Sequence, residues 1–216
     1  MTLDPSGGLN IECLELGELR TNCYVLTAGG VCWIVDPGLS PEPLVDHLRR
    51  NGLSPERILL THGHCDHIAG LAAVKEAFPG ALVTAPAGDA GMLTDPVANL
   101  SLPFGLRIAA VAADRTVSPG EELTMGPLNW RVLDAAGHTP GGVAYYCPAA
   151  EAVISGDALF AEGIGRTDIP GADESQLLRN IREGLLTLPG PTRVLPGHGP
   201  ATTIEHERKF NPFLAG

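Results

Sequence analysis

The segment His62-Gly63-His64-Cys65-Asp66-His67 constrains this chain more than any other feature of its sequence. Three imidazoles and one carboxylate stand within six positions, directly after the apolar run Ile58-Leu59-Leu60. His62 and His64 are two residues apart, so both side chains point to the same side at the end of a strand. The donors suit zinc, iron or manganese, and they are too dense for one tetrahedral ion. The segment therefore predicts a metal-binding loop that is carried by a buried strand.

Three more candidate ligands occur later in the chain. His138, Asp157 and His198 each follow a short apolar stretch and stand among glycines or prolines, the usual setting of a functional loop on a rigid strand. Their recurrence argues against a solvated polar loop with coincidental histidines. The two remaining histidines, His47 and His206, lie among charged residues on predicted helices and are expected at the surface.

Composition excludes several classes of function. The formal net charge is −11 and no cluster of Lys and Arg occurs, so a nucleic-acid partner is not expected. No apolar stretch reaches the roughly 18 residues that span a membrane, and the first ten residues lack the pattern of a signal peptide. Five cysteines without framework spacing indicate reduced thiols. We expect a cytoplasmic protein without a membrane partner, in which Cys65 is a spacer between ligands. The oligomeric state is not indicated.

Apolar runs and turn residues predict two groups of strands, each followed by helices. Strands are predicted at 11–16, 22–27, 31–35, 58–60, 82–85, 128–134, 143–147, 152–154 and 194–195, and helices at 41–51, 67–78, 175–188 and 202–209. Residues 86–120 have no clean period and are expected to form a helix plus a loop near the site. This order favours two sheets packed face to face with helices outside, in a single domain over residues 1–216.

The order of the candidate ligands resembles the pattern of the metallo-β-lactamase superfamily, HxHxDH followed by His, Asp and His. The resemblance spans about residues 10 to 200, and it is more specific for the metal site than for the substrate. It implies an α/β fold, the αββα sandwich of two mixed β-sheets with helices outside, and a dinuclear metal site. It gives the first ion His62, His64 and His138, the second ion Asp66, His67 and His198, and both ions the bridging carboxylate of Asp157.

The resemblance also implies the chemistry. A water shared by two ions about 3.5–4 Å apart becomes hydroxide near neutral pH. Asp66 is expected to orient that hydroxide and Asp157 to bridge the metal pair, so both are predicted catalytic residues. Zinc is the expected metal, with iron or manganese as alternatives. The β-lactamase branch usually has Cys at the position of Asp157, so the Asp is similar to the glyoxalase II branch and predicts poor antibiotic hydrolysis.

Supporting groups are expected behind the ligands, because a ligating imidazole usually donates its other N–H to an oxygen. Asp36, at the end of the strand predicted over 31–35, is one candidate. The hydroxyls of Thr61 and Thr139 are two more. Asp36 could instead be only a turn residue before Pro37, and the sequence leaves both interpretations open.

Residues 156–168 carry the clue to the substrate. They resemble the corresponding loop of glyoxalase II-like proteins and of persulfide dioxygenases, which act on glutathione-linked sulfur. In glyoxalase II a Lys matches Arg166 and helps hold a carboxylate of the thiol carrier, so Arg166 is predicted to bind the substrate. The alternative is an ion pair of Arg166 with Asp168 or Asp173 that stiffens the loop.

The segment after His198 resembles the short, single-domain bacterial glyoxalase II-like hydrolases. The chain continues for only about 18 residues after His198, so the helical glutathione-binding domain of full-length glyoxalase II is not expected. Gly199-Pro200-Ala201 stands where both glutathione-using families usually have a Tyr. This departure leaves the identity of the carrier thiol open.

The leading hypothesis is a dinuclear metal-dependent hydrolase of thioesters. It would cleave S-lactoylglutathione or a related acyl-thiol by attack of the metal-bridging hydroxide, as glyoxalase II does. A thiol leaves as the thiolate without a strong general acid, which suits a site with no evident acid. The alternatives are a persulfide dioxygenase with a single iron and a two-metal hydrolase of a lactone or another ester. The expected partner is a small-molecule thioester.

Overall fold

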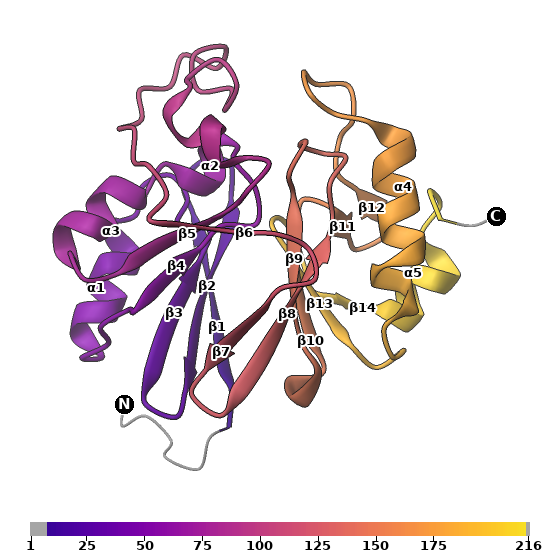
Figure 1. Ribbon diagram of the computed structural model, residues 1–216, viewed down its shortest axis with the longest axis horizontal. Helices are drawn as coiled ribbons and strands as arrows, with labels where there is room; N and C mark the ends of the chain where they lie inside the picture. Colours follow the sequence, from indigo (N-terminus) through magenta and orange to yellow (C-terminus); the bar gives the residue numbers. More distant parts are fainter. Residues whose placement is uncertain (1–7, 215–216) are drawn as a thin grey trace.

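The computed structural model describes residues 8–214, whose strands form two six-stranded sheets that lie face to face (Figure 1). The first sheet contains, in chain order, β1 (Asn10–Leu16), β2 (Thr21–Ala28), β3 (Val31–Val35), β4 (Arg57–Leu59), β5 (Leu82–Pro86) and β6 (Arg115–Val117). The second contains, in spatial order, β14 (Thr202–Thr203), β13 (Arg193–Pro196), β10 (Ala152–Gly156), β9 (Val143–Cys147), β8 (Leu128–Asp134) and β7 (Glu122–Met125). A separate hairpin joins β11 (Leu159–Phe160) to β12 (Gly163–Ile164).

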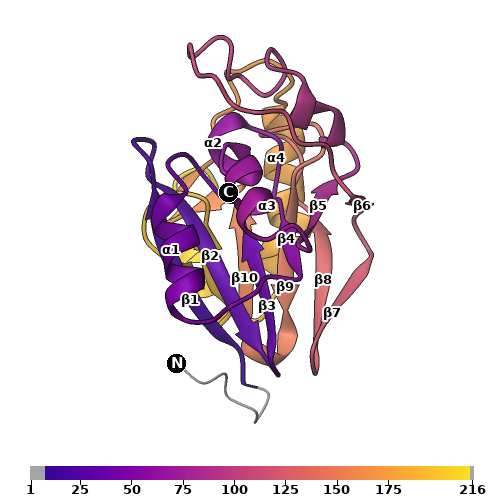
Figure 2. The ribbon, with the colours of Figure 1, turned by 90° about the vertical axis from the view of Figure 1, so that its left-hand side faces the viewer.

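Both sheets mix parallel and antiparallel pairs, and helices cover their outer faces. Strands β1 to β3 are antiparallel and β3 to β6 are parallel. In the second sheet β10 and β13 are parallel and the other pairs antiparallel. The outer helices are α1 (Glu42–Arg50), α2 (Cys65–Ile68) and α3 (Leu71–Ala77) on one side, and α4 (Glu174–Glu183) and α5 (Ile204–Phe210) on the other (Figures 1 and 2). The predicted α/β sandwich with αββα layers is therefore confirmed.

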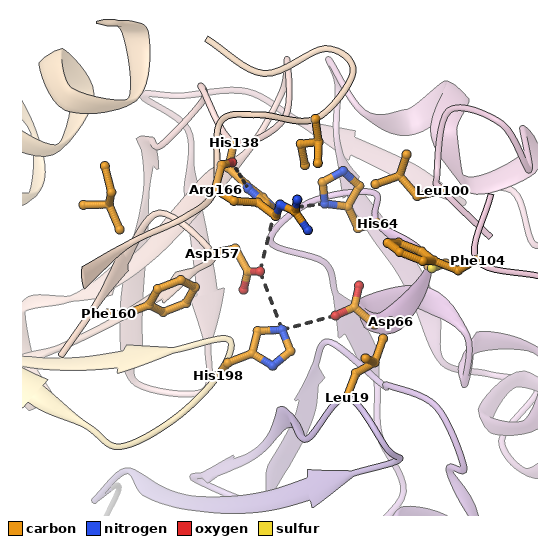
Figure 3. Close-up of a pocket in the computed structure, with 13 residues that line it drawn as sticks. Leu19, His64, Asp66, Leu100, Phe104, His138, Asp157, Phe160, Arg166 and His198 are labelled. Carbon is orange, nitrogen blue, oxygen red and sulfur yellow. Dashed lines mark hydrogen bonds and ion pairs between the residues drawn. The ribbon is translucent and has the colours of Figure 1, made fainter. Parts of the chain in front are cut away.

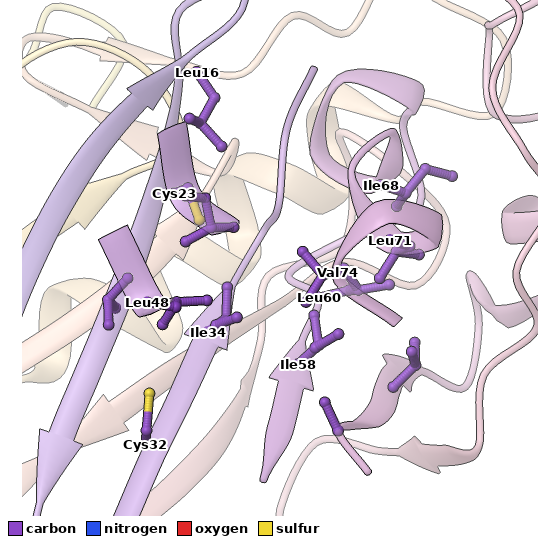
Figure 4. Close-up of a cluster of buried hydrophobic side chains, with 14 of the residues drawn as sticks. Leu16, Cys23, Cys32, Ile34, Leu48, Ile58, Leu60, Ile68, Leu71 and Val74 are labelled. Carbon is purple, nitrogen blue, oxygen red and sulfur yellow. The ribbon is translucent and has the colours of Figure 1, made fainter. Parts of the chain in front are cut away.

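Three apolar clusters hold these four layers together. One lies between the first sheet and its helices, where Ile34 and Ile58 meet Leu48 of α1 and Val74 of α3 (Figure 4). The second fills the space between the sheets, and the third packs the second sheet against α4 and α5. Successive residues of β2 alternate between the first two clusters, so the whole strand is buried. The layers thus fix the strand ends from which the site is built.

One predicted helix is broken in two. The helix expected over 67–78 is divided into α2 and α3 at Gly70. A Cβ on Gly70 would lie 2.8 Å from the carbonyl oxygens of both Pro37 and Gly38, and its N–H donates to the Pro37 oxygen. The loop after β3 therefore passes against the helix at the one residue that has room for it, and glycine is a weak helix former.

Other differences concern short elements. Residues 86–120 contain one turn of 3₁₀ helix (Ala90–Thr94) and then β6 at the sheet edge, instead of a full helix. The helix expected over 175–188 ends at Glu183, and a 3₁₀ turn follows at Leu185–Thr187. Strands β7, β11, β12 and β14 were not expected, because two to four residues carry too little periodicity to be recognised. Within residues 8–214, no helix is both long and apolar enough to cross a lipid bilayer.

The space between the sheets should dominate stability. We expect Leu26→Ala, at a fully buried position in this layer, to lower the free energy of unfolding by about 2–5 kcal/mol, because the lost contacts leave a cavity. Urea denaturation in the presence of a chelator measures this without a contribution from bound metal. Leu82→Ala, at a residue that is 48% exposed, is the matched control and should change the midpoint little. Equal effects of the two variants would contradict the prediction.

Candidate metal centre

All seven predicted ligands lie close together, beyond the ends of strands from both sheets. Figure 3 shows five of them: His64, Asp66, His138, Asp157 and His198. Strand β4 ends at Leu59, and after Leu60 and Thr61 the segment 62–67 leads into α2, whose first residue is Cys65. The other three ligands follow β8, β10 and β13 of the second sheet, in the order His138, Asp157 and His198. The prediction that these residues follow buried strands therefore agrees with their positions. Neither His47 nor His206 lies in this group.

The first group of donors consists of His62, His64 and His138, whose ligand atoms lie within 4.8 Å of one another. His138 Nδ1 is 2.8 Å from the carbonyl oxygen of Arg166. A carbonyl can only accept, so Nδ1 donates and Nε2 is free to face the site. His138 Nε2 lies 2.9 Å from His64 Nδ1. Burial, reinforced by the neighbouring imidazoles, lowers the pKa of His62 well below its ordinary value and the pKa of His64 to about 4. Both are neutral near pH 7, as metal ligands must be.

A buried carboxylate, that of Asp36, sets the orientation of two histidines. Its Oδ2 accepts hydrogen bonds from Thr61 Oγ1 at 2.6 Å and from His67 Nδ1 at 2.9 Å. Because the Thr61 hydroxyl proton is used on Asp36, its oxygen accepts from His62 Nδ1 at 3.0 Å. The Nε2 atoms of His62 and His67 are thereby directed toward the site. Of the two interpretations of Asp36, the geometry supports a positioning residue.

The second group of donors consists of Asp66, His67 and His198. His198 Nε2 lies 3.1 Å from Asp66 Oδ2, and His67 Nε2 lies 3.5 Å from the same oxygen. Desolvation opposes protonation of His67, but the carboxylates of Asp157, Asp66 and Asp36 raise its pKa well above its ordinary value. Desolvation would raise the pKa of Asp66, yet His67 and His198 hold it well below its usual range. In this group, each carboxylate stabilises the positive charge of a neighbouring imidazole, and each imidazole stabilises the negative charge of a neighbouring carboxylate.

Asp157 lies between the two groups. Its Oδ1 is 3.3 Å from His67 Nε2, and its Oδ2 is 3.6 Å from Nε2 of both His138 and His198. A Cβ on Gly197 would lie 2.1 Å from Asp157 Oδ1, and one on Gly165 would lie 1.9 Å from the Asp157 carbonyl oxygen. Only glycine leaves room for the Asp157 carboxylate at position 197 and for the Asp157 backbone at position 165. Its place between the groups is the one that a bridging carboxylate requires.

The donors fit a pair of divalent cations. The Nε2 atom of His62, which is directed toward the site, is buried and has no hydrogen-bond partner, although buried polar atoms nearly always have one. Neutral imidazole nitrogens and carboxylate oxygens are donors that zinc, iron and manganese accept. His62, His64 and His138 would hold one ion and Asp66, His67 and His198 the other. Asp157 would contact both.

Asp89 organises the site but is not evident from the sequence. It is completely buried, and its two carboxylate oxygens accept the backbone N–H of Gly63 at 3.0 Å and that of Gly141 at 2.7 Å. Gly63 separates His62 from His64, and Gly141 follows His138 by three residues. Asp89 therefore joins the loops of the first group. Its position shortly after a buried strand, as for Asp157, is the one signal that could have identified it.

Asn22 and Tyr24 of β2 hold the loop of His198 in a similar way. Asn22 Nδ2 donates to the carbonyl oxygens of Pro196 at 3.0 Å and Gly199 at 2.8 Å, and Tyr24 Oη donates to Pro196 at 2.7 Å. These bonds connect the two sheets beside the site. The partners are more than 170 positions apart in the chain, so no local pattern reveals them.

A cavity of about 430 Å³ opens above the donors. Five of the candidate ligands contribute to its floor, and most of its other lining residues are apolar. Arg166 lies at its rim, where the guanidinium forms two hydrogen bonds of 2.8 and 2.9 Å with Asp168. The predicted ion pair is present and the side chain still borders the cavity, so both interpretations of Arg166 fit the geometry. Cys65 lies at the wall, and burial raises its pKa to about 11, so its thiol is protonated at neutral pH.

Comparisons with known proteins identify relatives along nearly the whole chain. The model of the metallo-beta-lactamase superfamily matches residues 16–198. The chain is 41% identical to a protein of Bacillus subtilis named probable metallo-hydrolase YqgX, over 94% of this chain and 96% of the relative. It is 33% identical to hydroxyacylglutathione hydrolase GloC of Haemophilus influenzae, over 95% of this chain and 98% of the relative.

Two solved structures have the same fold. One, named BLEG-1 B3 metallo-beta-lactamase, is 40% identical and superposes with a TM-score of 0.91, covering 96% of this chain and all of the other. The second, TTHA1623 in a di-iron-bound form, is 37% identical with a TM-score of 0.85 and covers 94% of this chain and all of the other.

The role of Asp89 can be tested by Asp89→Asn. One oxygen becomes an NH₂ group that faces a backbone N–H, so one of the two loops is released. We expect the affinity of the first ion to fall on the order of tenfold, as for other supporting groups, while the second ion binds as before. Competition of the two bound zinc ions with a chromogenic chelator measures both affinities. Asp46→Asn, on the exposed face of α1, is the control. Equal loss of both ions would indicate general destabilisation and contradict the prediction.

Proposed function

We propose that this chain, which belongs to the metallo-beta-lactamase superfamily, is a two-metal hydrolase that cleaves thioesters. The observation that carries the proposal is Asp157, a carboxylate between two groups of donors at the floor of a cavity. Metal-dependent hydrolysis follows from the family and from the donor groups. The thioester as substrate goes beyond this. Zinc as the preferred metal also goes beyond it, because a structure with 37% identity holds two irons.

The chain's own residues supply most of what the reaction needs. Two divalent ions held by the donor groups would polarise a carbonyl and activate water at neutral pH. The Asp66 carboxylate is ionised, because neighbouring imidazoles lower its pKa, and it borders the cavity, where it can accept a hydrogen bond from water and orient it. Asp36 and Thr61 keep the imidazoles of His62 and His67 in one orientation.

A thioester suits this arrangement. Hydrolysis breaks the acyl C–S bond, forms a C–O bond to the water oxygen, and releases a carboxylate, a thiol and one proton. A thiol with a pKa of about 8.5 leaves readily as the thiolate, so the reaction requires no strong general acid. A relative at 33% identity is named hydroxyacylglutathione hydrolase, which supports S-lactoylglutathione or a related acyl-thiol as the first substrate to test.

β-Lactam hydrolysis is a second candidate, and one observation favours it. A structure with 40% identity and a TM-score of 0.91 is named a B3 metallo-beta-lactamase. Attack on a strained cyclic amide uses the same polarised carbonyl and activated water. The sequence predicts poor antibiotic hydrolysis because Asp occupies position 157. A cephalosporin therefore belongs in the same substrate panel.

We expect the zinc-loaded protein to release thiol from S-lactoylglutathione, and a chelator to abolish the release. Asp157→Ala should lower kcat/KM by more than about 100-fold, because supporting groups alone cost about 10–100-fold. It should also lower the number of bound ions measured by mass spectrometry. Asp46→Asn is the control. Full activity of the metal-free protein would contradict the proposal. So would one bound iron with oxygen uptake on a persulfide, the result expected of a dioxygenase.

The two interpretations of Arg166 predict different kinetics. If its guanidinium holds a substrate carboxylate, Arg166→Gln should raise KM for an anionic thioester up to about tenfold at low salt, with kcat unchanged. Asp168→Asn should then lower KM, because it releases the guanidinium from its ion pair. Steady-state kinetics at two ionic strengths measures both effects. An unchanged KM in both variants would leave Arg166 only the role of stiffening the loop.

A further inference from the structure

The walls of the cavity differ in character from its floor. Six of the lining side chains are aliphatic or aromatic, and they come from four separate segments of the chain: Leu19, Leu100, Phe104, Phe160, Ile164 and Ile169. The other lining residues are five of the candidate ligands, Cys65 and Arg166. From this division we infer that the thioester has apolar groups on both sides of its carbonyl, an inference that rests on the proposed hydrolysis of thioesters.

One apolar wall is formed by the β11–β12 hairpin. Phe160 and Ile164 stand on its two strands, and the ring of Phe160 lies 6.3 Å from the ring of His198, edge to face. Figure 3 shows Phe160 on one side of Asp157 and His198. A group that extends from the reacting carbonyl in this direction meets the aromatic ring of Phe160 and the aliphatic side chain of Ile164.

The opposite wall is formed by the β1–β2 turn and the long connection between β5 and β6. Leu19 belongs to the turn, and Leu100 and Phe104 belong to the connection (Figure 3). Leu19 is 46% exposed and Phe104 is 59% exposed. Exposed apolar side chains gathered at the mouth of a cavity mark a surface that a ligand covers. A thioester has two arms, the acyl chain and the thiol part, on the two sides of its carbonyl carbon. Because apolar walls stand on both sides of Asp157, each arm of a bound thioester lies against apolar side chains.

The charge around the cavity argues against a glutathione conjugate. Glutathione carries two carboxylates and one ammonium group at neutral pH, and charged groups are costly to bury without partners. Arg166 is the one Lys or Arg among the lining residues, and Asp168 already pairs with it. The chain has two lysines, and both pair elsewhere, Lys75 with Asp114 and Lys209 with Glu205. The rim can therefore receive at most one anionic group.

The size of the cavity sets the scale of the ligand. Pockets for small ligands enclose about 300–1,000 Å³, and the 430 Å³ found here lies near the lower limit. This volume accommodates a short or medium acyl chain together with a compact thiol. The substrate class is thus a small, predominantly apolar thioester with no more than one negative charge.

Four thioesters test the two arms separately. Lactoyl and hexanoyl groups are each joined to glutathione and to phenylmethanethiol, and each enzymatic rate is divided by the spontaneous hydrolysis rate of the same compound. We expect kcat/KM of the zinc-loaded protein to rise about tenfold or more when hexanoyl replaces lactoyl, and again when phenylmethanethiol replaces glutathione. This is the usual discrimination of an apolar pocket. S-hexanoyl phenylmethanethiol should be the best substrate and S-lactoylglutathione the poorest.

A pair of phenylalanine variants connects the preference to the wall. Phe104→Ala should lower kcat/KM for S-hexanoyl phenylmethanethiol about tenfold and leave that for S-lactoylglutathione nearly unchanged. Phe210→Ala, at a phenylalanine outside the cavity that is also 59% exposed, should change neither. Thermal unfolding of both variants verifies that each is folded.

The outcomes separate the inference from the function on which it rests. If S-lactoylglutathione is hydrolysed best and Phe104→Ala has no selective effect, thioester hydrolysis stands and the apolar substrate class is wrong. If none of the four compounds is hydrolysed by protein that carries two zinc ions, thioester hydrolysis itself is wrong and the inference fails with it. If kcat/KM rises tenfold for the apolar acyl group and for the apolar thiol, and Phe104→Ala reduces these preferences, the results support both thioester hydrolysis and the apolar substrate class.

Discussion

The hydrogen bonds that converge on the carboxylate of Asp36 are the interaction on which the organisation of the site depends. Asp36 is buried at the end of β3 and accepts from the backbone N–H and the hydroxyl of Thr61 and from the imidazole of His67. It adopts a left-handed backbone conformation, with φ of +53°, which Asp tolerates better than most residues. One side chain thus fixes the end of β4, the path of the loop and the donor atoms of two histidines.

Bringing the carboxylates and imidazoles of the site together lowers the stability of the folded chain when no metal is bound. Buried charges are unfavourable unless they are paired, and the site collects several carboxylates and imidazoles between apolar clusters. Protonation of His67 and His198, whose pKa values their carboxylate neighbours raise against desolvation, supplies the compensating positive charge. Metal ions would take over that charge and release the protons. Metal binding and the stability of this end of the sandwich are therefore coupled.

Much of this arrangement can be predicted from the sequence, and what cannot has a physical reason. Strand ends that carry His62, His138, Asp157 or His198 are recognisable, because a buried apolar run followed by a turn is a local pattern. Asp89 and Asn22 act through backbone groups that are distant in sequence, so only the fold brings them to their partners. The break at Gly70 likewise depends on the loop after β3, which packs against it only in the folded chain.

The structure also separates reactivity from selectivity. The candidate ligands follow strands whose positions are fixed by backbone hydrogen bonds and by the three clusters, so they tolerate little change. The apolar walls are side chains on a turn, a hairpin and a long connection, and Leu19 and Phe104 are largely exposed. Such residues can be exchanged without disturbing the core. Relatives that share the metal-binding end of the sandwich can therefore differ in the arms of the substrate that they accept, and the chemical character of the walls identifies the substrate class better than the identity of the ligands does.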